Sequence, residues 1–148
     1  MTTEESQRTG RIVVGIDGSP AATAALEWAA AMADSTGAAV EVIATWQWPT
    51  GYGAGPMYPA EYDPSGDAAR IVRKAVGAAS RDHPGVEFVP LVVEGHPAQV
   101  LVDASRGAQL LALGTRGRGE LGGLLLGSVT EHCAAHAHCP VLVLRARD

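Results

Sequence analysis

Short apolar runs alternate along the chain with segments of helical periodicity. The runs are nearly continuous, which is typical of strands buried on both faces of a parallel sheet. These predicted strands cover residues 11–16, 40–46, 86–93, 110–113 and 141–144. The pattern between them predicts helices over residues 21–36, 67–82, 97–107 and from 128 to about 137.

This alternation of strands and helices predicts a single α/β domain. We expect a doubly wound, five-stranded parallel sheet with helices on both faces and the strand order 3-2-1-4-5. The first helix is predicted to be capped by Ser19 and to end at Gly37. The face of this helix that packs against the sheet is expected to carry Ala25, Trp28, Ala29 and Met32. Ligands of such folds bind at the carboxyl ends of the strands, so the loops after the first and fourth strands are the candidate sites.

The composition removes several classes of function. Eleven Lys and Arg residues against sixteen Asp and Glu residues give a net charge of −5, which argues against nucleic acid and against an anionic membrane surface as partners. Residues 1–9 are polar and are expected to form a flexible tail, followed by one domain over residues 10–148. No run approaches the roughly 18 apolar residues of a membrane span, and no secretory signal is recognisable, so we expect a cytoplasmic protein.

Six of the eighteen glycines lie between Gly114 and Gly127. This segment follows the fourth predicted strand and leads into the last predicted helix. Glycines allow backbone N–H groups to approach an anion, and a helix N-terminus adds unpaired N–H groups. Arg116 and Arg118 add positive charge, so the segment is predicted to bind phosphate rather than to be a plain flexible connection.

Three known phosphate-loop patterns can be compared with this segment. The P-loop pattern fails because Ser128 stands where that pattern requires lysine. The dinucleotide fingerprint is matched in spacing by Gly117, Gly119 and Gly122, but it belongs between the first strand and the first helix, and here it precedes the last predicted helix. The third pattern, G-x2-G-x9-G-[ST], is matched completely by Gly114, Gly117, Gly127 and Ser128.

With this third pattern the chain resembles the ATP-binding branch of the universal stress protein family. The resemblance extends over nearly the whole chain and includes residues 13–19, Gly95-x-Pro97, residues 124–130 and residues 136–145. It implies a flavodoxin- or Rossmann-like fold and a stress-response protein that binds ATP, with Mg²⁺ held mainly by the phosphates. One departure is Gln109, where many members carry an acidic residue.

The resemblance also implies roles for individual residues. Gly15, Ile16 and Asp17 would lie against the nucleoside, with Asp17 on a ribose hydroxyl, and Ala44 would contact adenine. The ribose and phosphates would be held by Gly114, Thr115, Arg116, Gly117, Arg118, Gly119, Gly127, Ser128 and Val129. From the residues alone, Asp17 equally fits a turn or helix cap, and Ser128 with Glu131 fits a capping box.

Two other features have competing interpretations. The histidines and cysteines over residues 132–139 suggest zinc, but no paired C-x-x-C or H-E-x-x-H spacing is present, so no metal site is predicted. A bridge between Cys133 and Cys139 is left open. The apolar last strand, Val141 to Leu144, is expected to mediate a homodimer, as the resemblance implies, or else to be a buried inner strand.

The sequence therefore favours a nucleotide-dependent regulatory module with an unidentified protein partner and no catalytic residues. The first alternative is a slow ATPase or phosphotransferase, for which Glu120 and His132 are the nearest candidate bases, although nothing fixes either of them. The second alternative is a homodimer that acts without nucleotide. The complete G-x2-G-x9-G-[ST] pattern argues against this alternative.

Overall fold

A computed structural model describes residues 10–48, 59, 61–115 and 126–146 of the chain. Its five strands form one sheet in the predicted order β3-β2-β1-β4-β5, and all four pairings are parallel. The strands are β1 (Arg11–Gly15), β2 (Ala39–Trp46), β3 (Phe88–Glu94), β4 (Leu110–Gly114) and β5 (Val141–Leu144).

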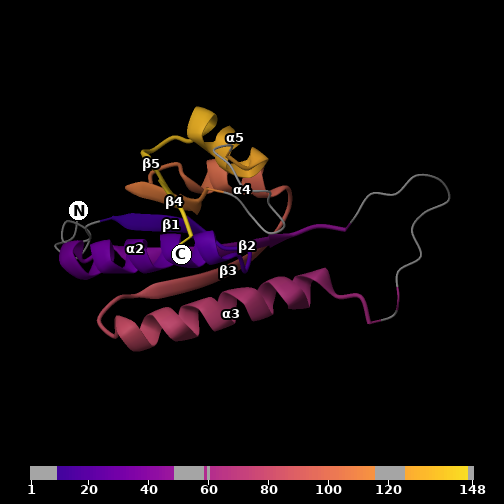
Figure 1. Cartoon of the computed structure of the whole chain (residues 1–148), viewed down its shortest axis with the longest axis horizontal. Coiled ribbons are helices and arrows are strands. Elements are labelled where there is room, and N and C mark those ends of the chain that lie inside the picture. Colours follow the sequence, from indigo (N-terminus) through magenta and orange to yellow (C-terminus); the bar gives the residue numbers. More distant parts are fainter. Residues whose placement is uncertain (1–9, 49–58, 60, 116–125, 147–148) are drawn as a thin grey trace, which may run out of the picture.

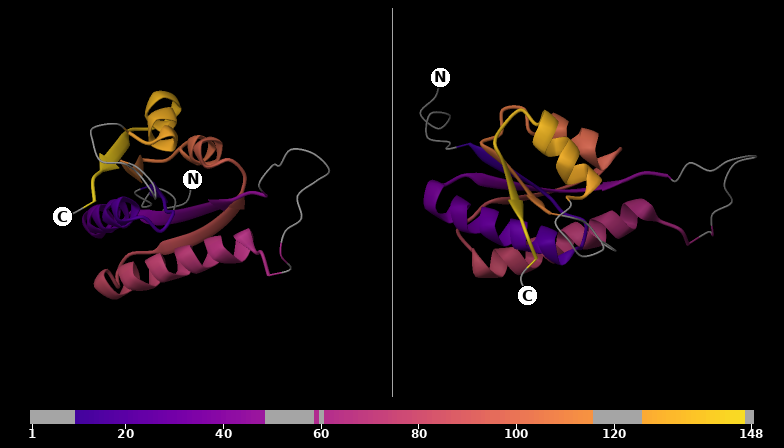
Figure 2. Two further views of the ribbon diagram at one scale, coloured as in Figure 1. Left: turned by 45° about the vertical axis from the view of Figure 1, so that its right-hand side comes forward. Right: turned by 45° about the horizontal axis from the view of Figure 1, so that its top comes forward.

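Helices cover both faces of this sheet (Figure 1). They are α2 (Pro20–Thr36), α3 (Pro64–Asp82), α4 (Pro97–Ala104) and α5 (Ser128–His136). Figure 2 shows α2 and α3 on one face and α4 and α5 on the other. Because successive side chains of a strand point to opposite faces, each strand contributes to two cores. In β1, Ile12 and Val14 pack with α2 and α3, whereas Val13 packs with α4 and α5.

Three details of the helices differ from the predictions. Helix α4 ends at Ala104, before the predicted end at residue 107. Helix α3 begins at Pro64, three residues earlier than expected, because the Asp63 carboxylate accepts the Gly66 N–H at 3.0 Å and Pro64 suits the first turn. In α2, Ala25 and Ala29 are buried as expected, but Trp28 is 45% exposed, so its inclusion in the inward face was wrong.

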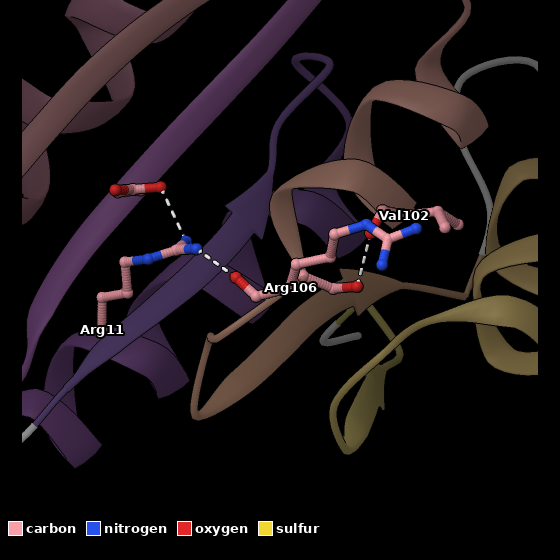
Figure 3. Close-up of polar contacts among 5 residues, drawn as sticks. Arg11, Val102 and Arg106 are labelled. Atoms are coloured by element: carbon pink, nitrogen blue, oxygen red, sulfur yellow. Dashed lines mark hydrogen bonds and ion pairs between the residues drawn. The ribbon is translucent and has the colours of Figure 1, made fainter.

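Arg11 ties together the elements at the amino ends of the strands. Its Nη1 atom lies 3.0 Å from Oε1 of Glu41, and its Nη2 donates to the carbonyl oxygen of Arg106 at 2.7 Å (Figure 3). Next to Arg106, the buried Ser105 hydroxyl oxygen accepts the N–H of His138 at 2.8 Å. These contacts join β1, β2 and the segments before β4 and β5, so this end of the sheet is held by its own side chains.

The described helices include none that is both long enough and apolar enough to cross a membrane.

Candidate functional site: a pocket at the carboxyl ends of the strands

A pocket of about 250 Å³ opens at the carboxyl ends of β1, β2 and β4. Its lining comes from these strand ends and from the first turns of α2, α4 and α5. The connections from β1 and β4 lead to helices on opposite faces of the sheet, so the strand order reverses at this point. A crevice at such a reversal is the usual ligand site of doubly wound folds.

The N-terminus of α5 differs from those of the other three described helices. Helices α2, α3 and α4 each begin with a proline and are capped by a side chain, from Ser19, Asp63 and His96 respectively. Helix α5 follows Gly127, has no side-chain cap and begins with Ser128. The residues of its first turn line the pocket, and their backbone N–H groups have no intrahelical acceptor.

This observation corrects the predicted capping box. The cap residue is Gly127, whose carbonyl oxygen accepts the N–H of Glu131 at 2.9 Å, and Ser128 is the first helical residue. Ser128 is exposed at the pocket, and its hydroxyl makes no capping hydrogen bond. A first turn with free N–H groups and the positive end of a helix dipole is suited to an anion.

Hydrogen bonds hold this first turn against the end of β4. The buried Thr130 hydroxyl donates to the Gly114 carbonyl oxygen at 2.7 Å, and the N–H of Gly127 donates to the Thr115 carbonyl oxygen at 2.8 Å. Thr115 in turn donates its N–H to Leu144 at the end of β5, at 2.7 Å. The anion-facing end of α5 is thereby fixed relative to the sheet.

The opposite side of the pocket is largely apolar. Ile43 of β2 and Leu101 of α4 form much of this wall, and both are nearly inaccessible to solvent. Leu113 of β4 adds a further buried apolar side chain nearer to α5. Ile16 and Pro97 continue the wall. Such a wall suits a flat heteroaromatic ring rather than a charged group.

Asp17 is the one ionisable residue among the described residues of the lining. One of its carboxylate oxygens accepts the Ser19 N–H at 2.9 Å, which is the predicted turn. The residue is exposed, and its second oxygen can still accept a hydrogen bond from a ligand hydroxyl. The turn and a role in ligand binding are therefore compatible.

Most of the other predicted site residues that the structure describes also lie at the pocket. Gly15, Ile16, Gly114, Gly127, Ser128 and Val129 line it. Thr115 is adjacent and contributes through the backbone hydrogen bonds given above. Arg116, Gly117, Arg118, Gly119 and the candidate base Glu120 lie outside the described residues.

Ala44 is placed differently from the other predicted residues. Its side chain is buried in the core beneath α2 and α3, on the face of the sheet away from the pocket. The neighbouring Ile43 and Thr45 point to the pocket face instead. The side chain of Ala44 therefore does not line this pocket, because strand side chains alternate between the two faces.

The sequence reasoning missed Ile43, Thr45, Leu101 and Leu113. A strand buried on both faces lacks the polar alternation that would indicate which positions face a ligand. The register of β2 against its neighbours supplies this information, and the continuous apolar run does not.

The cysteines and histidines of the last helix do not form a metal centre in the described part of the chain, where no group of three potential ligands is found. Cys133 and Cys139 are both free. Cys133 is fully buried between α5 and α4, and burial raises the pKa of its thiol to about 11. His132 and His136 are exposed, with ring centroids 4.4 Å apart.

Comparison with protein families identifies the class of protein. The model of the universal stress protein family matches residues 9–145. The chain therefore belongs to the universal stress protein family.

Two curated relatives come from Mycobacterium tuberculosis. Universal stress protein Rv2624c is 32% identical over 139 residues, which cover 92% of this chain and 48% of the relative. Universal stress protein Rv2623 is 32% identical over 154 residues, which cover 93% of this chain and 48% of the relative. The chain thus spans about half the length of the curated relatives that it matches.

Two solved structures share the fold over almost their whole length. A universal stress protein in complex with cAMP has a TM-score of 0.69 and 24% identity, with 95% of this chain and 99% of that chain covered. The universal stress protein from Archaeoglobus fulgidus in complex with dAMP has a TM-score of 0.67 and 25% identity, with 91% and 97% covered.

Proposed function

We propose that this protein is an ATP-binding regulatory module of the stress response, in which nucleotide occupancy controls contact with a protein partner. The observation that carries the proposal is the uncapped first turn of α5, which presents free N–H groups and the Ser128 hydroxyl to the pocket. The apolar wall opposite this turn suits the base, and Asp17 suits a ribose hydroxyl. Related structures in complex with cAMP and dAMP support an adenine nucleotide as the ligand class.

The phosphates of ATP fit the features of this pocket. Uncapped N–H groups at the α5 terminus suit the outer phosphates, and Arg116 and Arg118 of the glycine-rich segment add the positive charge that the described lining lacks. Mg²⁺ would be held mainly by the phosphates, because Asp17 is the one carboxylate of the described lining and a single carboxylate is a weak site for this ion.

A binding role is favoured over catalysis. His132, the candidate base that the structure describes, is not part of the pocket lining and is exposed on α5. A general base must reach the proton that it removes, directly or through one water molecule. We therefore assign at most weak ATP hydrolysis to the protein. We also propose a cytoplasmic location.

Strand β5 supports the proposed homodimer. It lies at one edge of the sheet, and its carbonyl oxygens at Pro140 and Leu144 accept hydrogen bonds from β4. In a parallel pair, every second residue of a strand turns its N–H and C=O groups towards the same neighbour, so Val141 and Val143 turn theirs away from β4. Val141 and Val143 therefore present unpaired backbone groups at the edge, where a second copy can supply the missing partner.

Release of bound ligand tests the function. Purified protein is denatured, and the supernatant is separated by anion exchange with detection at 260 nm. Intact ATP supports the proposal and ADP favours the slow ATPase. If the protein releases no nucleotide and added ATP leaves its melting temperature unchanged, the result favours the alternative of a homodimer that acts without nucleotide. We also expect Gly117→Glu to abolish binding while the fold is retained, since a carboxylate would occupy the phosphate position.

A further inference from the structure

The apolar wall of the pocket contains one side chain with a hydroxyl group, Thr45. It lies at the end of β2, two residues after Ile43 and on the same face of the strand. Thr45 is half-buried, and the structure describes no hydrogen bond between its hydroxyl and any other described residue. The remaining hydroxyls and the carboxylate of the lining belong to the turn after β1 and to the first turn of α5.

The backbone around Thr45 is fixed on both sides. Towards β1, the Ile43 carbonyl oxygen accepts the N–H of Ile16 at 2.9 Å. Towards β3, Thr45 pairs with Val93, and the carbonyl oxygen of Trp46 accepts the N–H of Gly95 at 2.8 Å. Because the strand cannot shift in either direction, the hydroxyl has a defined position on the wall, as a specificity-determining group requires.

Thr45 is also far enough from the anion-binding end to contact a different part of the ligand. Strand β2 is separated from β4 by β1, and neighbouring strands lie about 4.8 Å apart, so the two sides of the pocket are about 10 Å apart. The phosphates occupy the α5 side in the proposed function. Thr45 therefore faces the base rather than the phosphates.

From these observations we infer that the Thr45 hydroxyl hydrogen-bonds the polar edge of the base and makes this pocket selective among nucleoside phosphates. The inference rests on the proposed nucleotide binding and adds a residue that determines which base is accepted. A donor–acceptor group on an otherwise apolar wall discriminates strongly, because a base with the wrong edge leaves the hydroxyl and its own polar atoms unpaired.

The matched pair Thr45→Val and Thr45→Ser tests the inference. Valine keeps the shape of threonine and removes the hydroxyl, whereas serine keeps the hydroxyl and removes a methyl group. Affinities for ATP, GTP and inorganic triphosphate are measured by calorimetry on all three proteins. The triphosphate serves as a probe that has no base.

We expect Thr45→Val to weaken ATP binding by about five- to tenfold and to reduce the preference for ATP over GTP, in line with the loss of one neutral hydrogen bond. Triphosphate affinity should be unchanged, and Thr45→Ser should keep the preference of the wild type. Unchanged ATP affinity in Thr45→Val, or an equal loss for ATP and triphosphate, would overturn the inference while nucleotide binding stands. Failure of the wild type to bind any of the three ligands would reject the proposed function itself.

Discussion

At Gly114, β4 passes close to the first turn of α2. A Cβ atom at this position would lie 2.6 Å from the Cβ of Ala21, 2.7 Å from its carbonyl carbon and 2.8 Å from the Ala22 nitrogen. Two of these three contacts are with backbone atoms, which cannot rotate away. The glycine is therefore required by the close approach of a strand to a helix, and this approach brings the α2 terminus to the pocket.

Gly114→Ala is expected to lower the free energy of unfolding by about 1–3 kcal/mol, because the strand and the helix must move apart. Gly77→Ala is the matched control. Gly77 is exposed in α3 and no atom lies within 4 Å of its added Cβ, so alanine should stabilise the helix by about 0.5–1 kcal/mol. Urea denaturation of both variants measures the difference. Equal effects of the two substitutions would contradict the packing described for Gly114.

Cys133 links stability to pH. Burial raises the pKa of its thiol from 9.0 to about 11, so the folded state favours the neutral form. The resulting stabilisation is complete below the ordinary pKa and is lost as the pH rises from about 9 towards 11, with a total of roughly 2–3 kcal/mol.

We therefore expect unfolding experiments between pH 8 and 11 to show a steeper loss of stability in the wild type than in Cys133→Ala, which has no thiol to ionise. Cys139→Ala is the control and should keep most of the slope, because it leaves the fully buried thiol in place. If the wild type and Cys133→Ala lost stability in parallel with pH, ionisation of Cys133 would not be the cause.

The contact between α5 and β4 depends on Thr130. Its hydroxyl is the side-chain group that holds the first turn of α5 against the carbonyl oxygen of Gly114. Without it, the half-buried carbonyl oxygen loses a donor, and the first turn of the helix loses its fixed position at the pocket.

Thr130→Val should cost about 1–2 kcal/mol in the free energy of unfolding and should weaken ATP binding measured by calorimetry. Thr130→Ser retains the hydroxyl and should behave much more like the wild type in both measurements. A valine variant with unchanged stability and affinity would show that the contact does not position the helix.

The order and type of the elements could be predicted because local signals agree with the topology. Apolar runs mark the buried strands, and Ser19 with Pro20 marks the start of α2, so the succession of strands and helices and a parallel sheet between two helical layers followed. Helix boundaries that depend on a single capping residue were predicted less accurately. Helix α3 begins at Pro64 after the Asp63 cap, three residues before its predicted start.

The pocket was only partly predictable for a related reason. Its glycine and serine positions are visible as a spaced pattern, whereas its apolar wall consists of ordinary core residues. Whether Ile43, Ala44 or Thr45 faces the ligand depends on the pairing of β2 with both neighbours, which is a property of the folded sheet.

In the folded chain, helix α2 has an exposed tryptophan on the side that faces β4 and β5. Trp28 lies two helical turns after Ala21, which packs against Gly114, and about 120° around the helix from Asp34, which contacts His83 of α3. An apolar ring that is 45% exposed beside an open strand edge is the kind of surface that a second copy would cover.

We predict a dimer at micromolar concentration in light scattering, and a shift to monomer in Trp28→Arg or Val143→Pro. Proline at position 143 removes an outward N–H and leaves the hydrogen bonds between β4 and β5 intact. Trp48→Arg is the control, because Trp48 is similarly exposed but lies at the end of β2, away from β5. A monomeric wild type would contradict the proposed assembly.

The central claim is that the uncapped first turn of α5 binds the phosphates of a nucleotide, and Ser128→Asp tests it most directly. An acidic residue in the first turn of a helix is favourable to folding by about 0.3–1 kcal/mol, so the variant should be at least as stable as the wild type. Its carboxylate would nevertheless occupy the phosphate position and repel the ligand. Titration calorimetry with ATP should therefore show one binding site in the wild type. In Ser128→Asp the affinity for ATP should be at least 100-fold weaker, a loss of roughly 3 kcal/mol in binding free energy, or binding should be absent. Wild-type affinity in a correctly folded Ser128→Asp variant would contradict the claim.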